Sequence, residues 1–456
     1  MKQYQGSKVL AALFMAAVPL VLAGCFHSSS SDSTTKVTGS VAFMDGWMDG
    51  LPQVTWGPEV TVTAFAPAQR SWQWMVSADH AGAEFVNGGT GCVNCHSDAG
   101  FAPSPAELGA ALVGADEDPI PGKRGFVDIT VQAAYDAEKF YLRAAWQTKR
   151  PGVTHDIWTY QGGDWVRNSH EKPEELGTDE VYSREDRIGV MFAPVSNVIP
   201  AADGHPNNFN NVGCWVTCHS DMHDMPDMDE AGYTLGDEIT KYLKISRVGG
   251  GGANDAVDDT AVAAYMNAGT FPDMWHFRGG RGAAVQTLTD GYVMSTRSSD
   301  SGAHPYATNS PAPGNYMYDI DVMGFHALPG DEWADNMDNA PPLIVGVNAV
   351  EFDHTVVFNE GDILPRRRLT VPVEPRDSRN DVTAYSSWKD GIWTVIMVRD
   401  RDTGHAQDHV LNPAAGNYTF AFSIFEDHSG GRWHHVTFPV TLGATGSGAI
   451  IQAAAN

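Results

Sequence analysis

Two of the five cysteines lie in a short motif that ends in a histidine. Residues 91–97 read GCVNCHS and give Cys92, Cys95 and His96 a C-x-x-C-H spacing. This spacing is typical of covalent c-type haem attachment, in which two thiols add to the haem vinyl groups and the adjacent histidine becomes an axial iron ligand. A disulfide between the two cysteines would instead close a very tight and strained loop. The motif therefore predicts a covalent haem with His96 as its proximal ligand.

A second motif has one more spacer residue. Cys214, Cys218 and His219 stand in a C-x-x-x-C-H arrangement within NVGCWVTCHSDMHDMPDM. Cys, Cys and His are also a zinc ligand set, for which His223 or an Asp could be the fourth ligand. A lipid signal and the first motif already account for the other cysteines, so we expect a second covalent haem with His219 on its iron. The zinc alternative stays open.

The second axial position of each iron has several candidate ligands. His80 precedes the first motif closely enough to fold back over it, and Met225 follows the second. His434 and His435 are neighbours on a predicted strand, so their side chains point to opposite faces. A Met ligand would raise the reduction potential relative to two histidines. The alternatives are surface histidines and a Met-rich loop that packs on the haem edge.

The N-terminus has the pattern of an exported lipoprotein. In residues 1–24, Lys2 and Lys8 precede an apolar run that is too short for a typical membrane span. The run ends in Leu-Ala-Gly-Cys25, which resembles a bacterial lipobox and predicts lipidation of Cys25. Residues 25–38 are Ser-rich and read as a flexible tether. The residue after Cys25 is not Asp, which favours the outer membrane of a Gram-negative-type envelope, although an ordinary secretory signal with a spare cysteine is the alternative.

The chain is strongly acidic, with a formal net charge of -27 over 456 residues. Such a charge argues against nucleic acid and anionic membrane surfaces as partners. It suits a basic redox protein as partner, and an adaptation of solubility to a salty environment explains it equally well.

The remaining pattern is mainly β. Short alternating or aromatic runs separated by Gly, Asp and Asn predict a β-sandwich with few short helices, in which loop insertions bear the haems. We expect residues 39–125 to hold N-terminal strands and the first haem insertion, and residues 126–445 to form the sandwich with the second haem. Helices are expected at 105–112 and 256–267, and loops at 248–255 and 300–313. Strands are expected at 60–66, 126–134, 139–146, 187–192, 369–373, 391–399, 417–425 and 433–442.

Several of these segments resemble the ethylbenzene dehydrogenase-related haem-binding domain. They include residues 127–147, Glu185 to Ile188 and the DMWHF segment at 273–277, and the C-terminal runs 386–404 and 416–442 agree. The resemblance implies a β-sandwich that holds haem at one end. In the best-known members the domain is the γ subunit of a molybdenum enzyme of the dimethyl sulfoxide reductase group, carries b-type haem and passes electrons. An additional haem b is therefore an open question, and the covalent motifs bring this chain closer to lipoprotein cytochromes with the same domain.

These observations favour a dihaem c-type cytochrome that carries electrons at the periplasmic or outer-membrane face. It could be the electron-transfer partner of a respiratory oxidoreductase. No nucleophile triad, phosphate-binding loop or nicotinamide fingerprint stands in a convincing context, which argues against an enzyme. Two alternatives stay open, namely a haem peroxidase or reductase with one open axial site and a haem-containing ligand-binding or sensor module.

Overall fold

The computed structural model describes residues 44, 46–97, 100–116, 119–120, 122–168, 185–202, 204–217, 242–247, 257–310, 315–330, 340–426 and 434–456. The predicted signal, Cys25, the tether and the predicted loop 248–255 lie outside these residues. Cys218, His219 and Met225 lie outside them as well. Within the described ranges, no helix combines the length and the apolar character that a membrane crossing requires.

The described strands of the core form one 13-stranded sheet that folds over itself in two layers. β2 and β3 make the predicted antiparallel hairpin, and β17 and β16 extend it. The first layer contains β1 (Val60–Phe65), β2 (Phe126–Tyr135), β3 (Lys139–Gln147), β16 (Thr383–Lys389) and β17 (Ile392–Asp400). The second contains β6 (Arg187–Pro194), β7 (Asp273–Arg278), β8 (Gly291–Val293), β9 (Arg297–Ser299) and β18 (Tyr418–Phe425).

Three short strands join the two layers at their margins. β19 (His435–Val436) pairs with β1 and β18, while β20 (Val440–Ala444) and β21 (Ile451–Ala455) connect β18 to β2. Hydrogen bonds thus join β1 and β2 of the first layer to β18 of the second, while β16 and β9 stand at the two ends of the sheet. This leaves fewer unpaired strand edges than two separate sheets would have.

The main core lies between the layers and is rich in aromatic side chains. Phe140 of β3 lies 6.2 Å from Trp275 of β7 and 6.5 Å from Phe420 of β18, measured between ring centroids. Phe277 and Trp393 meet edge to face at 5.9 Å. The period-2 alternation that predicted these strands places one apolar face of each layer against the other. The predicted mainly β fold, a sandwich with few short helices, is confirmed.

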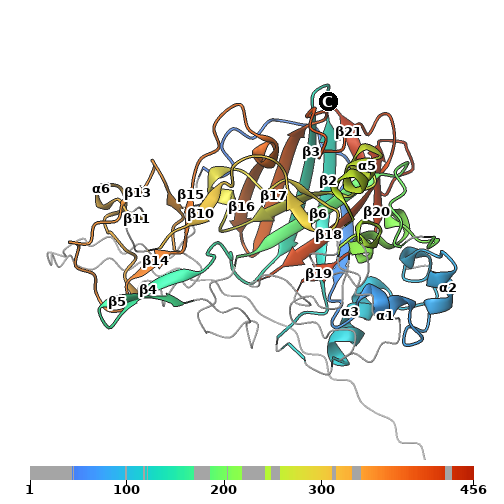
Figure 1. Ribbon diagram of the computed structural model, residues 1–456, viewed down its shortest axis with the longest axis horizontal. Coiled ribbons are helices and arrows are strands. Elements are labelled where there is room, and N and C mark those ends of the chain that lie inside the picture. The colour runs from blue at the N-terminus through green and yellow to red at the C-terminus, as the bar shows by residue number, and fades with distance from the viewer. Residues whose placement is uncertain are drawn as a thin grey trace, which may run out of the picture. The chain divides into compact units, whose positions relative to one another are not determined.

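A second apolar cluster covers the outer face of β18, β6 and β7. Short helical segments pack on this face, and α1 to α3 gather near β19 in Figure 1. We refer to it as the helix-side cluster, and it includes Phe65, Cys92, Trp215, Met274 and Phe438. The helical segments are α1 (Trp72–Val76), α2 (Ala83–Asn87), η2 (Cys92–Asn94), α3 (Pro105–Gly114), α4 (Phe209–Val212), η3 (Gly213–Thr217), η4 (Lys244–Ser246) and α5 (Asp259–Asn267).

The remaining elements are short and were not predicted. The strands among them form three small sheets and are two to five residues long, and the others are single helical turns. These elements are β4 (Ile157–Gln161), β5 (Asp164–Asn168), β10 (Tyr306–Thr308), β11 (Tyr316–Tyr318), β12 (Leu343–Ile344), β13 (Ala349–Glu351), β14 (Ile363–Pro365), β15 (Arg367–Leu369), η5 (Ala283–Val285), α6 (Ile320–Met323) and η6 (Ser378–Asn380).

Three predicted elements differ from the structure. The strand expected at 369–373 is wrong, because β15 ends at Leu369 and Pro372 follows, which lacks an N–H for a ladder. The strand expected at 433–442 is interrupted between β19 and β20, where Pro439 stands. The loop expected at 300–313 contains the short strand β10.

Candidate haem-binding site

The first cysteine motif forms a compact turn at the edge of the helix-side cluster. The backbone N–H groups of Cys95 and His96 donate to the carbonyl of Cys92 at 3.2 and 2.9 Å. Cys92 is buried and Cys95 is half-buried, and neither is in a disulfide. Burial raises the pKa of the Cys92 thiol to about 12. The turn thus holds both thiols and the histidine on one short stretch of chain, as the sequence motif requires.

His80 and His96 are held in the same way. His80, in the loop between α1 and α2, contacts the carbonyl of Met75 through Nδ1 at 2.9 Å. His96 contacts the carbonyl of Pro103 through Nδ1 at 2.9 Å. Because a carbonyl can only accept, both Nδ1 atoms carry the proton, and Nε2 of each ring keeps its lone pair. This is the arrangement in which a backbone carbonyl orients a metal-binding imidazole.

The two rings are neighbours with nearly parallel planes, and the distance between their centroids matches that of two imidazoles on one metal ion. Their centroids are 6.4 Å apart and their planes differ by 20°. Imidazoles that bind one ion from opposite sides have metal–nitrogen bonds of about 2 Å each, which puts their centroids about 6 Å apart. Burial lowers the pKa of His80, and His96 nearby adds to the effect. A neutral imidazole is the form that binds a metal. The residues present therefore fit an axial histidine pair.

Aromatic side chains surround this histidine pair. Phe438 stacks on His96 at 5.5 Å and lies 4.8 Å from Phe65. Trp74 lies 5.0 Å from His80. No sequence motif includes Phe438 or Trp74. The sequence offers only the weak indication that each is an aromatic residue a few positions from a histidine. These apolar rings cover part of the surface of the two histidines, which remain half-buried.

The second motif is described only in part. Cys214 lies in η3, next to the buried Trp215 and Val216. Gly213 has φ +59°, and an added Cβ would lie 3.2 Å from the ring of Pro439. Glycine is the residue that adopts this positive φ and fits beside Pro439 without strain. Cys218 and His219 lie outside the described residues, so the choice between haem and zinc stays a prediction.

Two asparagines, one of them buried, tie the loops of the two motifs together. Asn207 Nδ2 donates to the carbonyl of Val86 at 2.5 Å, and Asn211 Nδ2 donates to the carbonyl of Gly89 at 3.2 Å. Asn211 also donates to the side-chain oxygen of Asn207 at 3.0 Å. Asn207 is fully buried. Both asparagines stand shortly before Cys214 in sequence, and the carbonyls to which they donate stand shortly before Cys92. These hydrogen bonds therefore hold Cys92 and Cys214 close together.

The other candidate ligands differ from His80 in their surroundings. His435 is fully buried, with Nε2 2.9 Å from the carbonyl of Arg124 and Nδ1 3.5 Å from Lys123 Nζ. Burial, with Lys123 next in importance, holds its pKa well below the ordinary value. The ring of His434 stacks on Phe425 at 5.0 Å. Both ring nitrogens of His435 thus have protein partners, so the geometry favours His80 among the described candidates.

Comparisons with known proteins show which family this chain belongs to. The family model described as ethylbenzene dehydrogenase matches residues 105–437. The chain is also similar to a protein named cytochrome c-552 from Stutzerimonas stutzeri, with 25% identity over 394 residues that cover 86% of this chain and 87% of that protein. Together these findings indicate a haem-related role, in electron transfer or in an enzyme. Because the family model covers well over half of its residues, the chain belongs to the ethylbenzene dehydrogenase family.

Proposed function

We propose that this protein is a dihaem c-type cytochrome that carries electrons. Cys92 and Cys95 would hold the first haem through thioether bonds, with His96 and His80 as its two axial ligands. The observation that carries the proposal is the 6.4 Å separation of these two nearly parallel imidazoles, each oriented by a backbone carbonyl. The membership of a haem-related family and the relative named as a cytochrome support it.

Two histidine ligands favour electron transfer over bond chemistry at this site. A haem with both axial positions filled supplies a one-electron carrier with no open position for a substrate. The carbonyls of Met75 and Pro103 orient the two imidazoles, so the chain itself would hold these ligands in place. Phe438 and Trp74 add apolar surface beside the imidazoles, which would reduce their contact with solvent.

We also propose that Cys214, Cys218 and His219 hold a second haem c. The asparagine contacts between the two motif loops would keep the two haems close, so that an electron can pass from one to the other. The buried Asn207 and the half-buried Asn211 make these contacts, which would preserve this relation during turnover.

The cellular setting is part of the same proposal. Cys25 would be lipidated and would anchor the exported chain to a membrane of a Gram-negative-type envelope, at the outer membrane or the periplasmic face. Buried acyl chains contribute about 0.8 kcal/mol per CH₂ to such anchoring. With a net charge of -27, the protein would best fit a basic redox partner.

The first experiment combines a pyridine haemochrome assay with intact mass spectrometry of the mature protein. We expect c-type spectra only, a mass gain of two haems and a lipid at Cys25. One covalent haem together with bound zinc would contradict the second haem site and leave a monohaem protein with a structural metal.

The second experiment tests the axial pair with His80→Ala, His80→Met and the exposed control His354→Ala. We expect the oxidised wild type and the control to show a low-spin first haem. His80→Ala should open a position that takes up cyanide or carbon monoxide, while His80→Met should keep six ligands and raise the midpoint potential. An unchanged spectrum and potential in both His80 variants would refute His80 as a ligand.

A further inference from the structure

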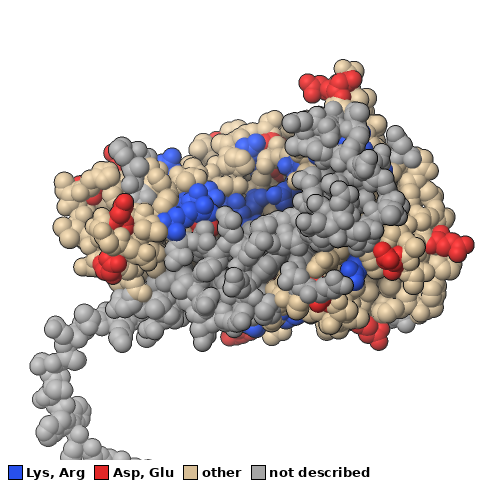
Figure 2. All heavy atoms as spheres, turned by 60° about the horizontal axis from the view of Figure 1, so that its bottom comes forward, with Lys and Arg blue, Asp and Glu red and all other residues tan. Residues whose placement is uncertain are grey.

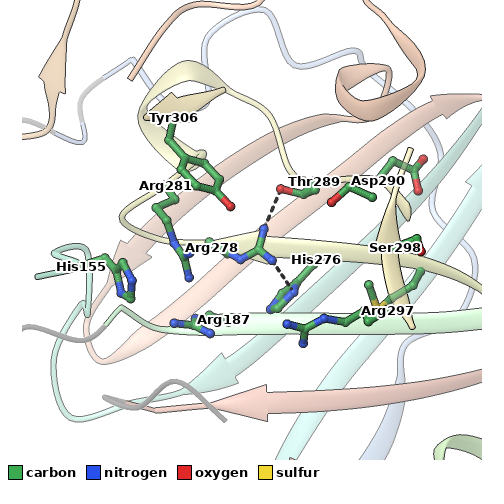
Figure 3. A pocket seen from close by; sticks show the side chains of 12 residues that line it. His155, Arg187, His276, Arg278, Arg281, Thr289, Asp290, Arg297, Ser298 and Tyr306 are labelled. Atoms are coloured by element: carbon green, nitrogen blue, oxygen red, sulfur yellow. Dashed lines mark hydrogen bonds between the residues drawn. The ribbon is translucent and has the colours of Figure 1, made fainter. Parts of the chain in front are cut away.

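Four arginines converge on one pocket of about 370 Å³ in this acidic protein (Figure 3). Arg187 lies on β6, Arg278 on β7, Arg281 just after β7 and Arg297 on β9. Figure 2 shows lysine and arginine side chains gathered in a band across one face of the molecule. A concentration of guanidinium groups stands out against the net charge of -27.

Two of these arginines have no ion pair with a carboxylate among the described residues. Glu185 is fully buried and lies 2.6 Å from Arg281 Nη2 and 3.2 Å from Arg187 Nε. Asp290 lines the pocket but lies 3.3 Å from the fully buried Arg399. In the described part of the chain, Arg278 and Arg297 are therefore available to meet the charge of a bound anion.

His276 adds a neutral hydrogen-bond donor to the same pocket. It is 3% exposed, and its Nδ1 lies 2.9 Å from Arg278 Nη2. Because a guanidinium can only donate, Nδ1 accepts and the proton of the neutral ring sits on Nε2. Burial and then the neighbouring arginines, Arg278 first, hold the pKa of His276 well below its ordinary value. The ring thus stays neutral with Nε2–H as a donor.

Two buried donors in the pocket lack acceptors. His276 Nε2 and Arg278 Nε have no hydrogen-bond partner among the residues that the structure describes. Arg278 uses its other nitrogens on His276 and on Thr289 Oγ1 at 2.6 Å. A buried donor without an acceptor costs about 1–3 kcal/mol, so a site with several such donors is built to receive acceptor atoms.

The pocket adjoins the second cysteine motif along the outer face of the sheet. Arg278, His276 and Met274 alternate on that face of β7, opposite Arg187, Gly189 and Met191 of β6. Met274 belongs both to the pocket lining and to the helix-side cluster. Thr217, three residues after Cys214, contacts Met191 Sδ at 3.9 Å. A group held by the second motif would therefore lie beside the pocket.

We propose that this pocket binds an oxoanion with at least two negative charges, or a pair of carboxylates, through Arg278, Arg297, Arg187 and the Nε2–H of His276. Guanidinium forks match the paired oxygens of carboxylate and phosphate. Two sources share this chemistry, namely a free oxoanion and the propionate carboxylates of a haem on the second motif. The second source rests on the proposed function and the first does not.

The test is calorimetric titration of the holoprotein with inorganic phosphate at low ionic strength. Arg297→Gln removes an exposed pocket arginine, and Lys389→Gln removes one positive charge at an exposed site outside the pocket. We expect binding of one phosphate, weakened about tenfold by Arg297→Gln and unaffected by Lys389→Gln. Equal loss in both variants would overturn the proposal, because it would reduce the effect to overall charge. Circular dichroism checks that both variants fold.

The double variant Cys214→Ala with Cys218→Ala separates the two sources. Binding of phosphate by the unmodified holoprotein identifies a site for free oxoanions. Binding that appears only in the double variant shows that haem propionates fill the pocket in the native protein. Binding in neither protein overturns the proposal. If the haemochrome assay finds no second haem, the propionate source fails together with the proposed function, and the phosphate titration still decides the pocket.

Discussion

Raising the pH from 7 to 8 should destabilise this protein through a cluster of carboxyl groups around Arg399. The guanidinium of Arg399 is fully buried, and its Nη1 lies 2.9 Å from Asp273, 3.3 Å from Asp290 and 3.6 Å from Asp408. Two further carboxyls, Asp300 and Asp381, border the same group. One buried cation therefore faces more acidic groups than it can neutralise, and we refer to them as the Arg399 cluster.

The protonation of Asp300 and Asp381 sets the sign of the effect. Burial raises the pKa of each to about 8, and the neighbouring Asp408 contributes in both cases. In the unfolded chain an Asp has a pKa of about 3.9. Between these values the folded state binds protons that the unfolded chain has released. Unfolding therefore releases protons, and stability falls as the pH rises towards 8.

The size of the effect follows from the number of protons held. A carboxyl with a pKa of about 8 keeps roughly three quarters of a proton between pH 7 and pH 8, which corresponds to about 1 kcal/mol. Asp300 and Asp381 together give about 2 kcal/mol as an upper value. In this window an unfolded histidine, with a pKa of about 6.5, binds about a tenth of a proton, so each histidine whose pKa is lowered in the folded state opposes the fall by about 0.1 kcal/mol.

Chemical denaturation of the holoprotein at pH 7 and pH 8 measures this difference, and Asp300→Asn assigns it. An amide cannot ionise but keeps the acceptor for Ser378 Oγ, which lies 2.7 Å from Asp300 Oδ2. We expect the variant to lose about 1 kcal/mol of the pH dependence, while the exposed control Asp390→Asn keeps all of it. Stability that rises between pH 7 and 8, or an unchanged slope in Asp300→Asn, would refute the reasoning.

Three further predictions concern the core and the motifs. Gly213→Ala should destabilise the protein by about 1–2 kcal/mol, because φ is +59° there and a proline ring lies 3.2 Å from the added Cβ; thermal unfolding measures it. Trp393→Phe removes the buried hydrogen bond from Nε1 to Asp186 Oδ2 at 2.8 Å and should cost about 1–3 kcal/mol in urea denaturation. In folded protein made without haem, Cys92 should react with iodoacetamide much more slowly than Cys95, and mass spectrometry of the peptides would show equal labelling if this is wrong.

The long strands could be predicted because their sequence pattern and their packing agree. In β2, β3 and β17 every second residue enters the core, and the turn Tyr135–Asp136–Ala137–Glu138 separates two such runs. The strands of the small sheets are too short for a period to appear. Their pairing depends on partners far along the chain, such as β14 with β4, and local sequence does not encode such partners.

The sequence predicted only those parts of the candidate site that lie in or next to the first cysteine motif. The C-x-x-C-H spacing gave Cys92, Cys95 and His96, and proximity along the chain suggested His80. The role of the Met75 and Pro103 carbonyls depends on how loops fold back, which no spacing reveals. The arginine pocket was missed because its four arginines come from three segments that are far apart in sequence, around residues 187, 278–281 and 297.

The burial of Cys92 constrains how the protein matures. In the folded chain this thiol has 5% exposure and a pKa of about 12, so it is neither accessible nor nucleophilic. If a haem is attached there, as proposed, its attachment would have to precede closure of the helix-side cluster over the motif. The assembly machinery would then compete with folding for the same segment, and sequence changes that accelerate local folding would lower the yield of cofactor-loaded protein without altering its final stability.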